Sequence, residues 1–360
     1  MVENELFSRK KRAITGCLLG TAVGDALGLP FEGLTKARII KLEPDFYAYS
    51  FLGNLGFCSD DTEHSCMVAQ ALIAARGDLN TFKSNLSWRL RFWLLSIPAG
   101  IGLATLRGIV NLWLGFSPDN SGVFSAGNGP AMRSTILGVV YGNEKDTFLN
   151  YIRANTRLTH SDPKAFFAAV AAGFAAFLSS ERELISPDYY FEELATLLHK
   201  EDWSEFTQII EKMVESLNKD ESTEEYAQKM GLEKGITGYS YHTVPVVLHC
   251  WLRNQDDFAT ALKNVIRLGG DTDTTAAILG GIIGASCGKE GIPHKWLQNL
   301  AEWPCTVRWM EGLASSLSLA IFEKKDLKPP NLFFPWILLR NFIFLCIVLF
   351  HGLRRLLPPY

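Results

Sequence analysis

The chain has 360 residues, of which 48% are hydrophobic and 20% charged, with a formal net charge of −3 at neutral pH. This composition is typical of a globular protein with a large buried core and excludes an intrinsically disordered chain. A slightly acidic chain lacks the basic surface of a nucleic-acid-binding protein, so we expect no nucleic acid among its partners. The seven cysteines are scattered and contain no Cys-x-x-Cys pair, which favours reduced thiols over a disulfide framework or a zinc site.

The sequence predicts helix almost throughout the chain. The first 16 residues are charged and lack the apolar centre of a signal peptide. Two Ala-rich apolar stretches, 64–76 and 163–179, are typical of helices that are buried on most sides. The charged stretch 181–235 predicts an outer pair or trio of amphipathic helices. With little β-type alternation and no repeats, the sequence predicts one all-α domain over residues 1–325.

Three stretches rich in Gly and Pro predict long loops between these helices: 98–102, 115–130 and 235–245. Loops of that size in a compact helical domain are more often functional than idle.

Residues 326–360 form a hydrophobic tail of a different character. Within it, 333–350 contains only two polar residues, Arg340 and Asn341. As a helix this stretch would be about 27 Å long, slightly shorter than a hydrocarbon core of about 30 Å. Placing Arg340 at the bilayer centre would cost about 2.5–3.5 kcal/mol on insertion scales. Three alternatives stay open: the tail spans a membrane, lies flat on one as an interfacial helix, or packs on the domain.

Of these alternatives, we expect attachment to a membrane. A single span at the extreme carboxyl end would be a tail anchor, with the domain on the cytosolic side. A short span followed by basic residues suits a thin membrane such as the mitochondrial outer membrane.

Two acidic clusters each stand immediately before an apolar helical stretch: SDDT at 59–62 and DTDT at 271–274. Helix capping alone explains one aspartate at such a position, but two carboxylates held close repel unless a positive charge lies between them. If the clusters meet, four carboxylates and two hydroxyls form an all-oxygen ligand set that suits Mg²⁺, Mn²⁺ or Ca²⁺. Spacing leaves the meeting open, since Asp271 and Asp273 converge only if the chain is still extended where the helix begins.

A glycine-rich stretch, SAGNGPAMR at 125–133, runs into a predicted helix with Pro130 near its first turn. It is either a plain junction between loop and helix or a phosphate-binding segment. In the second case Gly127 and Gly129 let backbone N–H groups approach a pyrophosphate at the helix N-terminus.

Six motifs together resemble the ADP-ribosylglycohydrolase family and stand in that family's order. They are GCLLGTAVGDALGLPFEG (16–33), SDDT (59–62), GIGLATLRG (100–108), SAGNGPAMR (125–133), THSDPKA (159–165) and LGGDTDTTAAILGGIIGA (268–285). The resemblance implies an all-α orthogonal helical bundle around a central binuclear metal cleft. It also implies two Mg²⁺ ions in that cleft, with Mn²⁺ as a substitute.

The resemblance assigns roles to individual positions. The implied metal ligands are Ser59, Asp60, Asp61, Asp271, Asp273 and Thr274, with Ser59 standing where the family usually has Thr. The implied catalytic carboxylates are Glu32, which falls where the family carries a glutamate near the scissile bond, and Asp60 and Asp61.

The implied substrate contacts are Gly127, Asn128 and Gly129 for the diphosphate and distal ribose, His160 for a phosphate, and Tyr239 for the adenine end. Taken without the motifs, Glu32 would be a solvated loop carboxylate, His160 a structural histidine and Tyr239 a core residue. His242 replaces an acidic residue that is common at that point in bacterial relatives.

The implied reaction is hydrolysis of the glycosidic bond that joins ADP-ribose to a modified protein side chain. In it the metals orient the distal ribose and a carboxylate activates water. The PFEG spacing resembles the arginine-directed bacterial branch, so ADP-ribosylarginine is the expected substrate. Alternatives are ADP-ribosylserine or O-acetyl-ADP-ribose hydrolysis, and a catalytically silent relative that binds ADP-ribose. A magnesium-dependent isoprenoid synthase is a rival class with paired aspartates, but "DDTEH" lacks that class's third acid.

We expect the domain to be monomeric. Its partner would be an ADP-ribosylated protein, associated with a membrane if the tail is an anchor, and ADP-ribose would be the product.

Overall fold

The computed structural model describes residues 2–43, 46, 48–181 and 184–354. Within these residues the chain is helical, and β-structure is limited to isolated bridges between loops. This confirms the all-α fold expected from the sequence. The first nine helices are α1 (Val2–Gly28), α2 (Lys36–Leu42), α3 (Asp60–Ala75), α4 (Leu79–Leu95), α5 (Leu103–Trp113), α6 (Gly129–Met132), α7 (Thr135–Tyr141), α8 (Lys145–Arg157) and α9 (Pro163–Glu181). The remainder are α10 (Pro187–Leu198), α11 (Ser204–Asn218), α12 (Thr223–Lys229), α13 (Ser240–Arg253), α14 (Phe258–Ile266), α15 (Thr272–Cys287), α16 (His294–Asn299), α17 (Val307–Phe322) and α18 (Phe334–Arg354), with short 3₁₀ turns η1 (Leu29–Phe31) and η2 (Lys289–Gly291).

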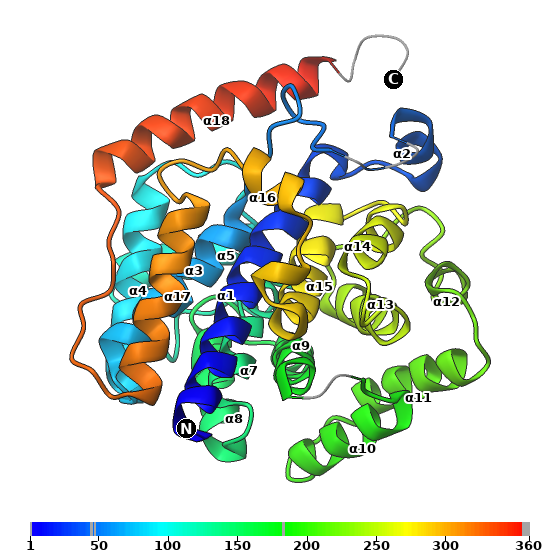
Figure 1. Cartoon of the computed structure of the whole chain (residues 1–360), viewed down its shortest axis with the longest axis horizontal. Helices are drawn as coiled ribbons and strands as arrows, with labels where there is room; N and C mark the ends of the chain where they lie inside the picture. Colours follow the sequence, from blue (N-terminus) through cyan, green and yellow to red (C-terminus); the bar gives the residue numbers. More distant parts are fainter. Residues whose placement is uncertain (1, 44–45, 47, 182–183, 355–360) are drawn as a thin grey trace.

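Helices α1 and α15 form the central pair of the fold and pack along most of their length (Figure 1). Glycines four residues apart share one face of a helix, and Gly16 and Gly20 of α1 face Gly280 and Gly284 of α15. A Cβ at Gly20 would lie 2.8 Å from the carbonyl carbon of Gly280, and one at Gly284 equally close to that of Gly16. Only hydrogen fits between the two backbones, so these glycines set how closely the helices approach.

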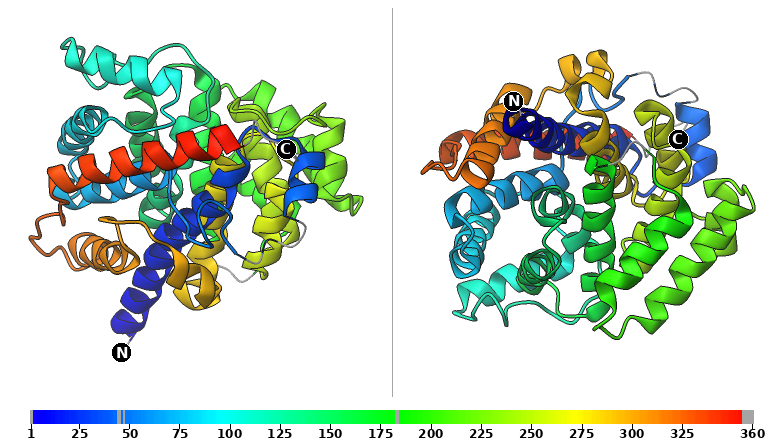
Figure 2. Two further views of the ribbon diagram at one scale, coloured as in Figure 1. Left: turned by 90° about the horizontal axis from the view of Figure 1, so that it is seen from above. Right: turned by 60° about the horizontal axis from the view of Figure 1, so that its bottom comes forward.

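The other helices surround this pair and bury it. Helices α3, α7, α9 and α17 pack around α1 and α15 on one side, and α13 and α14 cover α15 on the other (Figures 1 and 2). Helix α9 contains the Ala-rich stretch 163–179 and is buried along most of its length, as the sequence predicts. The outer helices α10, α11 and α12 form the expected amphipathic trio, in which α11 and α12 rest on α13.

Two helix starts differ from the sequence expectation. Helix α3 begins at Asp60 rather than 64, so Asp60 and Asp61 lie in its first turn and not ahead of it. The expected loop 235–245 is wrong in its second half, because α13 begins at Ser240 and continues through Pro245. Burial of nearly the whole of α13 outweighs the hydrogen bond lost at that proline. The expected loop at 98–102 is confirmed, and the one at 115–130 is confirmed except for its last two residues, because α6 begins at Gly129.

Within the part of the chain that the structure describes, three helical stretches are long and apolar enough to cross a membrane: Glu5–Phe31, Pro163–Glu181 and Phe334–Arg354. The first two are 94% and 78% buried over their apolar windows, so the protein core accounts for their composition. Helix α18 is only 17% buried and lies along one edge of the domain (Figure 1).

Candidate functional site

The two acidic clusters meet where α3 and α15 begin. The hydroxyl of Thr274 donates to Oδ2 of Asp61 at 3.2 Å, and the hydroxyl of Ser59 donates to the same oxygen at 3.0 Å. A carboxylate of the first cluster is therefore held between a hydroxyl of each cluster.

Helix capping does not explain Asp271. Its backbone is not helical (φ −81°, ψ 72°), so the chain turns before α15 as convergence requires, yet its side chain makes no capping hydrogen bond. Oδ2 of Asp271 instead accepts a hydrogen bond of 2.6 Å from the Asn128 amide. The first cluster differs, because Ser59 does cap α3 by accepting from the Asp61 backbone N–H at 3.3 Å.

Asp25 of α1 is a further carboxylate of the site, and sequence reasoning missed it. It is fully buried and accepts hydrogen bonds from the Ser59 N–H at 2.9 Å and from the hydroxyl and N–H of Thr62 at 2.6 and 3.1 Å. Burial raises the pKa of Asp25 to about 7. Asp25 thus fixes the loop that carries the first cluster. The signal was available, since Asp25 is the single charged residue between 13 and 28.

The ionised form of the carboxylates in the site is strongly disfavoured. Burial, followed by the charge of neighbouring carboxylates, raises the pKa values of Asp60, Asp61 and Asp273 well above the ordinary range. Oδ1 of Asp61 and Oδ1 of Asp273 are buried and have no hydrogen-bond partner among the residues that the structure describes. Unpaired buried oxygens on repelling carboxylates are what a hard cation would satisfy, so the donor set fits a divalent ion.

The binuclear cleft itself is not shown. In the described ranges, no three Asp, Glu, His or Cys side chains already surround one point as metal ligands do.

A cleft of about 560 Å³ opens beside these carboxylates. Most of the site residues expected from the sequence line it: Glu32, Asp60, Gly127, Asn128, Gly129, His160, Asp271, Asp273 and Thr274. Ser59 and Asp61 are buried and do not line it, but Asp61 accepts a hydrogen bond from Thr274, which does. The glutamate is exposed, whereas Asp273 is 5% exposed. The cleft therefore has an accessible carboxylate and a desolvated acidic side.

Tyr239 is the one candidate that the structure places elsewhere. It lines a neighbouring cavity of about 420 Å³ with Tyr241 and His242, and its hydroxyl lies 3.3 Å from the ammonium of Lys164. A backbone bridge to Gly127 nevertheless joins Tyr239 to the glycine-rich loop at the cleft.

The glycine-rich loop packs closely on His160. A Cβ at Gly127 would lie 2.9 Å from Nε2 of His160, so a larger residue at this position would displace the His160 ring. Burial, reinforced by the charge of Arg133, lowers the pKa of His160 to about 3, so its ring is neutral at pH 7 and carries one N–H. Pro130 lies in the first turn of α6, as the sequence predicts. The amide of Asn128 contacts both Asp271 and the Thr243 hydroxyl, which means that Asn128 positions the second acidic cluster.

The sequence assigned no role to two further features of the site. The segment 100–105 lines one side of the cleft, and it belongs to the motif GIGLATLRG. The fully buried guanidinium of Arg133 donates to Asn155 and Thr159 at 2.7 Å each, and its charge acts on Asp60. Arg133 closes the motif SAGNGPAMR, so both signals were present in the sequence without a structural reason to interpret them.

The structure thus combines an all-helical domain with two acidic clusters and a glycine-rich loop around one polar cleft. A family model described as ADP-ribosylglycohydrolase matches residues 7–327. The chain belongs to the ADP-ribosylglycohydrolase family, and the isoprenoid synthase alternative is therefore wrong.

Individual relatives agree with this assignment. A protein of Archaeoglobus fulgidus is 30% identical over 84% of this chain and 94% of its own length. An ADP-ribosyl-[dinitrogen reductase] glycohydrolase of Rhodospirillum rubrum is 29% identical over 79% and 89%, and the ADP-ribosylhydrolase ARH3 of Bos taurus is 26% identical over 88% and 95%. A solved structure, an ADP-ribosylglycohydrolase-related protein complex, aligns with a TM-score of 0.64 at 26% identity, over 86% of this chain and 98% of that one.

Proposed function

We propose that the cleft hydrolyses the glycosidic bond between ADP-ribose and a modified protein side chain. Family membership supports ADP-ribosyl glycohydrolase chemistry in general. The observation that carries the proposal is the contact of Thr274 with Asp61, which joins the two acidic clusters beside a cleft of 560 Å³. Clefts of this size accommodate small-molecule and cofactor ligands.

The ligand set proposed for two Mg²⁺ ions, with Mn²⁺ as a substitute, is Ser59, Asp60, Asp61, Asp271, Asp273 and Thr274. When bound, the ions would supply Lewis-acid polarisation and orientation of the distal ribose. Asp25 holds the first cluster in place through Ser59 and Thr62, and Asn128 holds the second through Asp271.

Glu32 is the residue that we assign to the attacking water. It lines the cleft next to Gly33 and its side chain is exposed, so water reaches it without a desolvation cost. Its negative charge adds to burial in raising the pKa of Asp273, so the two carboxylates interact across the cleft. A carboxylate in this position orients a water and accepts its proton as the glycosidic bond breaks.

The glycine-rich loop and His160 form the diphosphate end of the proposed site. Gly127 and Gly129 present backbone rather than side chains to the cleft, and His160 turns Nε2 towards this loop while its Nδ1 lies 2.9 Å from the Thr159 hydroxyl. Tyr239 would contact the adenine only if this end of the ligand extends past the Gly127 bridge towards the neighbouring cavity.

The linkage that we favour is ADP-ribosylarginine. The PFEG spacing around Glu32 resembles the arginine-directed branch, and one relative is named for dinitrogen reductase. The ARH3 relatives match almost equally well, so serine-linked conjugates and O-acetyl-ADP-ribose are the second candidate.

A comparison of two peptides tests the reaction and the linkage together. The full-length protein is incubated with Mg²⁺ and peptides that differ only in carrying ADP-ribosylarginine or ADP-ribosylserine, and released ADP-ribose is quantified. We expect release from the arginine peptide, with a loss of about 100-fold or more in Asp273→Asn and an unchanged rate in the exposed control Asp256→Asn.

Release from the serine peptide alone would support the proposed hydrolysis but overturn the assignment of arginine as the modified side chain. No release from either peptide, while ADP-ribose still binds, would overturn the reaction in favour of a silent binding protein.

A further inference from the structure

Helix α18 is amphipathic in the opposite sense to a helix on a water-soluble surface. Its two polar residues within 333–350 face the domain, where Arg340 is 7% and Asn341 1% exposed. Phe344 packs inwards as well, but many of the helix's other large apolar residues face outwards, among them Phe342 at 68% and Phe350 at 63% exposed. A surface helix in water buries its apolar side and exposes its polar side. The outward side of α18 therefore fits an apolar medium.

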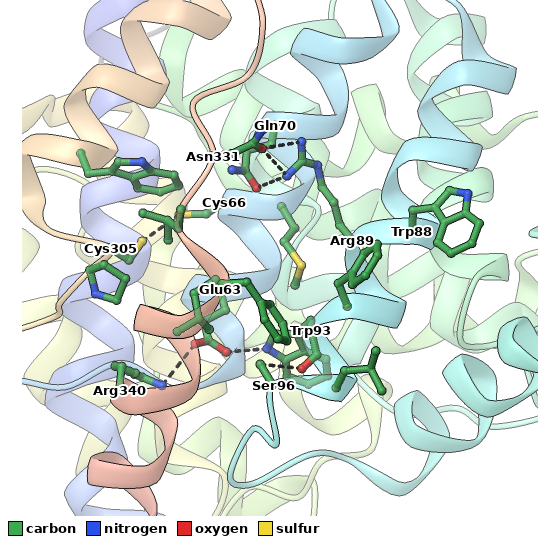
Figure 3. A pocket seen from close by; sticks show the side chains of 18 of the residues that line it. Glu63, Cys66, Gln70, Trp88, Arg89, Trp93, Ser96, Cys305, Asn331 and Arg340 are labelled. Carbon is green, nitrogen blue, oxygen red and sulfur yellow. Dashed lines mark hydrogen bonds and ion pairs between the residues drawn. The ribbon is translucent and has the colours of Figure 1, made fainter.

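Polar contacts fix α18 to the domain in this orientation. Arg340 donates to Glu302 at 2.9 Å, to Glu63 at 3.2 Å and to the carbonyl of Cys58 at 2.6 Å, and Asn341 donates to the carbonyl of Ser96 at 2.8 Å. Figure 3 shows the Arg340–Glu63 pair, with Glu63 also accepting from the indole of Trp93 at 2.5 Å.

Drawing α18 away to span a bilayer would break these contacts. It would leave the two carboxylates without their cation and carry the guanidinium into hydrocarbon, both of which are costly.

The apolar surface continues from α18 onto both of its neighbours. On one side, the ring of Phe92 contacts that of Phe334 with centroids 6.5 Å apart, and Leu95 and Ile97 follow at 50% and 68% exposed. On the other side, Phe51 stacks on Phe344, and Leu52 and Leu55 beside it are exposed. We call this continuous surface the docking face: the outward side of α18 with residues 92–97 and 52–55.

The charge pattern indicates what covers the docking face. Its three parts, 52–55, 92–97 and α18, contain no acidic residue. Basic residues stand on both sides of α18, with Lys328 before it and Arg354 at its end, while Arg340 is paired inwards with Glu63 and Glu302. A surface that is apolar at its centre and free of acidic residues complements a bilayer with anionic lipids.

We infer that α18 lies flat in the interface of an anionic bilayer and docks the whole domain on it, without crossing. Trp303 and Trp336, whose rings lie 5.4 Å apart and are 42% and 48% exposed, would sit at headgroup level, where tryptophan is enriched. The occupant is the lipid surface itself.

The docking face also borders the catalytic cleft. The segment that follows α4 carries Ile97 in the docking face and Gly100 and Leu103 in the cleft lining. On the other side, His351 of α18 lies 3.1 Å from the carbonyl of Pro30, two residues before Glu32. This last inference rests on the proposed function. A domain docked in this way would reach ADP-ribosylated proteins held at a membrane surface, and we assign these as its substrate class.

Vesicle flotation with the full-length protein tests the docking. The probes are vesicles of phosphatidylcholine alone and of phosphatidylcholine mixed with phosphatidylglycerol. We expect flotation with the mixed vesicles, weaker flotation with phosphatidylcholine, and a loss of about 100-fold in partitioning for Phe342→Glu combined with Phe350→Glu. The control is Leu184→Glu, which changes a side chain of similar exposure (69%) three residues before α10 and should partition as the wild type does. Helix α10 lies at the opposite end of the molecule from α18 (Figure 1).

Two readouts keep the outcomes separate. Hydrolysis of a soluble peptide and the far-ultraviolet circular dichroism spectrum should be unchanged in the double variant, so a folding defect or a failure of the proposed function would not be mistaken for a failure of docking. Absence of flotation, equal loss in Leu184→Glu, or a dimer in solution that the double variant abolishes would each overturn the proposal. The last result would assign the docking face to a second copy of the chain.

Protease protection separates lying flat from spanning. A peptide tag at the carboxyl end of the vesicle-bound protein should be removed by protease added outside. A protected tag would show that the helix crosses the bilayer and would contradict the flat arrangement.

Discussion

Replacing Gly280 by alanine tests how the central helix pair builds the site. The new Cβ would lie 2.9 Å from the carbonyl carbon of Gly20 and closer still to its oxygen, whereas non-bonded carbons prefer about 3.5–4.0 Å. Helices α1 and α15 must then separate by roughly 1 Å or deform. Overpacking of this kind costs about 1–3 kcal/mol, and the higher helix propensity of alanine returns about 1 kcal/mol. We expect a net loss of about 1 kcal/mol in the free energy of unfolding.

Urea denaturation of Gly280→Ala and of the control Gly312→Ala measures this loss. Gly312 is a helical glycine in α17 with nothing within 4 Å of an added Cβ, so alanine there should stabilise by about 0.5–1 kcal/mol. Because α15 carries Asp273 and α1 carries Asp25, Gly280→Ala should also lower kcat/KM by about 100-fold, as a 1 Å misplacement does. If Gly280→Ala were as stable as Gly312→Ala, the close packing of α1 and α15 would not limit stability and the reasoning would be refuted.

Three further predictions concern buried charge. Asp273→Asn should raise the unfolding temperature in EDTA, because it removes one of several mutually repelling buried carboxylates, and should abolish the stabilisation by added Mg²⁺; a thermal shift of the opposite sign in EDTA would contradict this. Arg340→Met should lower the free energy of unfolding by about 3–5 kcal/mol in urea, because Glu63 and Glu302 stay buried without their cation; an unchanged urea midpoint would show that the pairs contribute nothing. Burial lowers the pKa of His249 to about 4, so on acidification the histidine is protonated in the unfolded chain before it is protonated in the folded one. The free energy of unfolding should therefore fall by about 3 kcal/mol as the pH drops from about 6.5 to 4. The same fall in His249→Gln would rule out His249 as its source.

The fold and much of the site followed from the sequence for identifiable reasons. Hydrophobic periodicity marks buried helices directly, which is why the helix within 163–179 and the outer trio within 181–235 were correct. The helix within 64–76 was correct apart from its start. The two acidic clusters stood out because paired carboxylates before an apolar helix are hard to explain as caps.

The positions that failed depend on tertiary contacts. Asp25 lies in the last turn of α1 and gains its role only because α1 packs against the loop that carries Ser59. Pro245 reads as a helix breaker until the burial of α13 is known. Tyr239 belongs to the cavity beside the cleft, and a motif does not state which way a side chain on its border points.

The tail shows the same limit most clearly. Composition identifies 333–350 as apolar enough for a membrane, but only the contacts of Arg340 and Asn341 reveal which side of α18 faces the domain. A polar pair in an apolar helix can equally mark a pore, a strained span or a docking contact. The contacts that the polar pair makes on α3 and after α4, both far away in sequence, distinguish between these three alternatives.

Release of ADP-ribose from an ADP-ribosylated peptide, followed before and after removal of divalent ions, tests the central account most directly. The full-length protein should release ADP-ribose in Mg²⁺, stop on addition of excess EDTA and recover when Mg²⁺ is restored, while Asp273→Asn should stay inactive throughout. Release that continued in EDTA, or that Asp273→Asn carried out at the wild-type rate, would contradict the assignment of the joined acidic clusters as the catalytic centre.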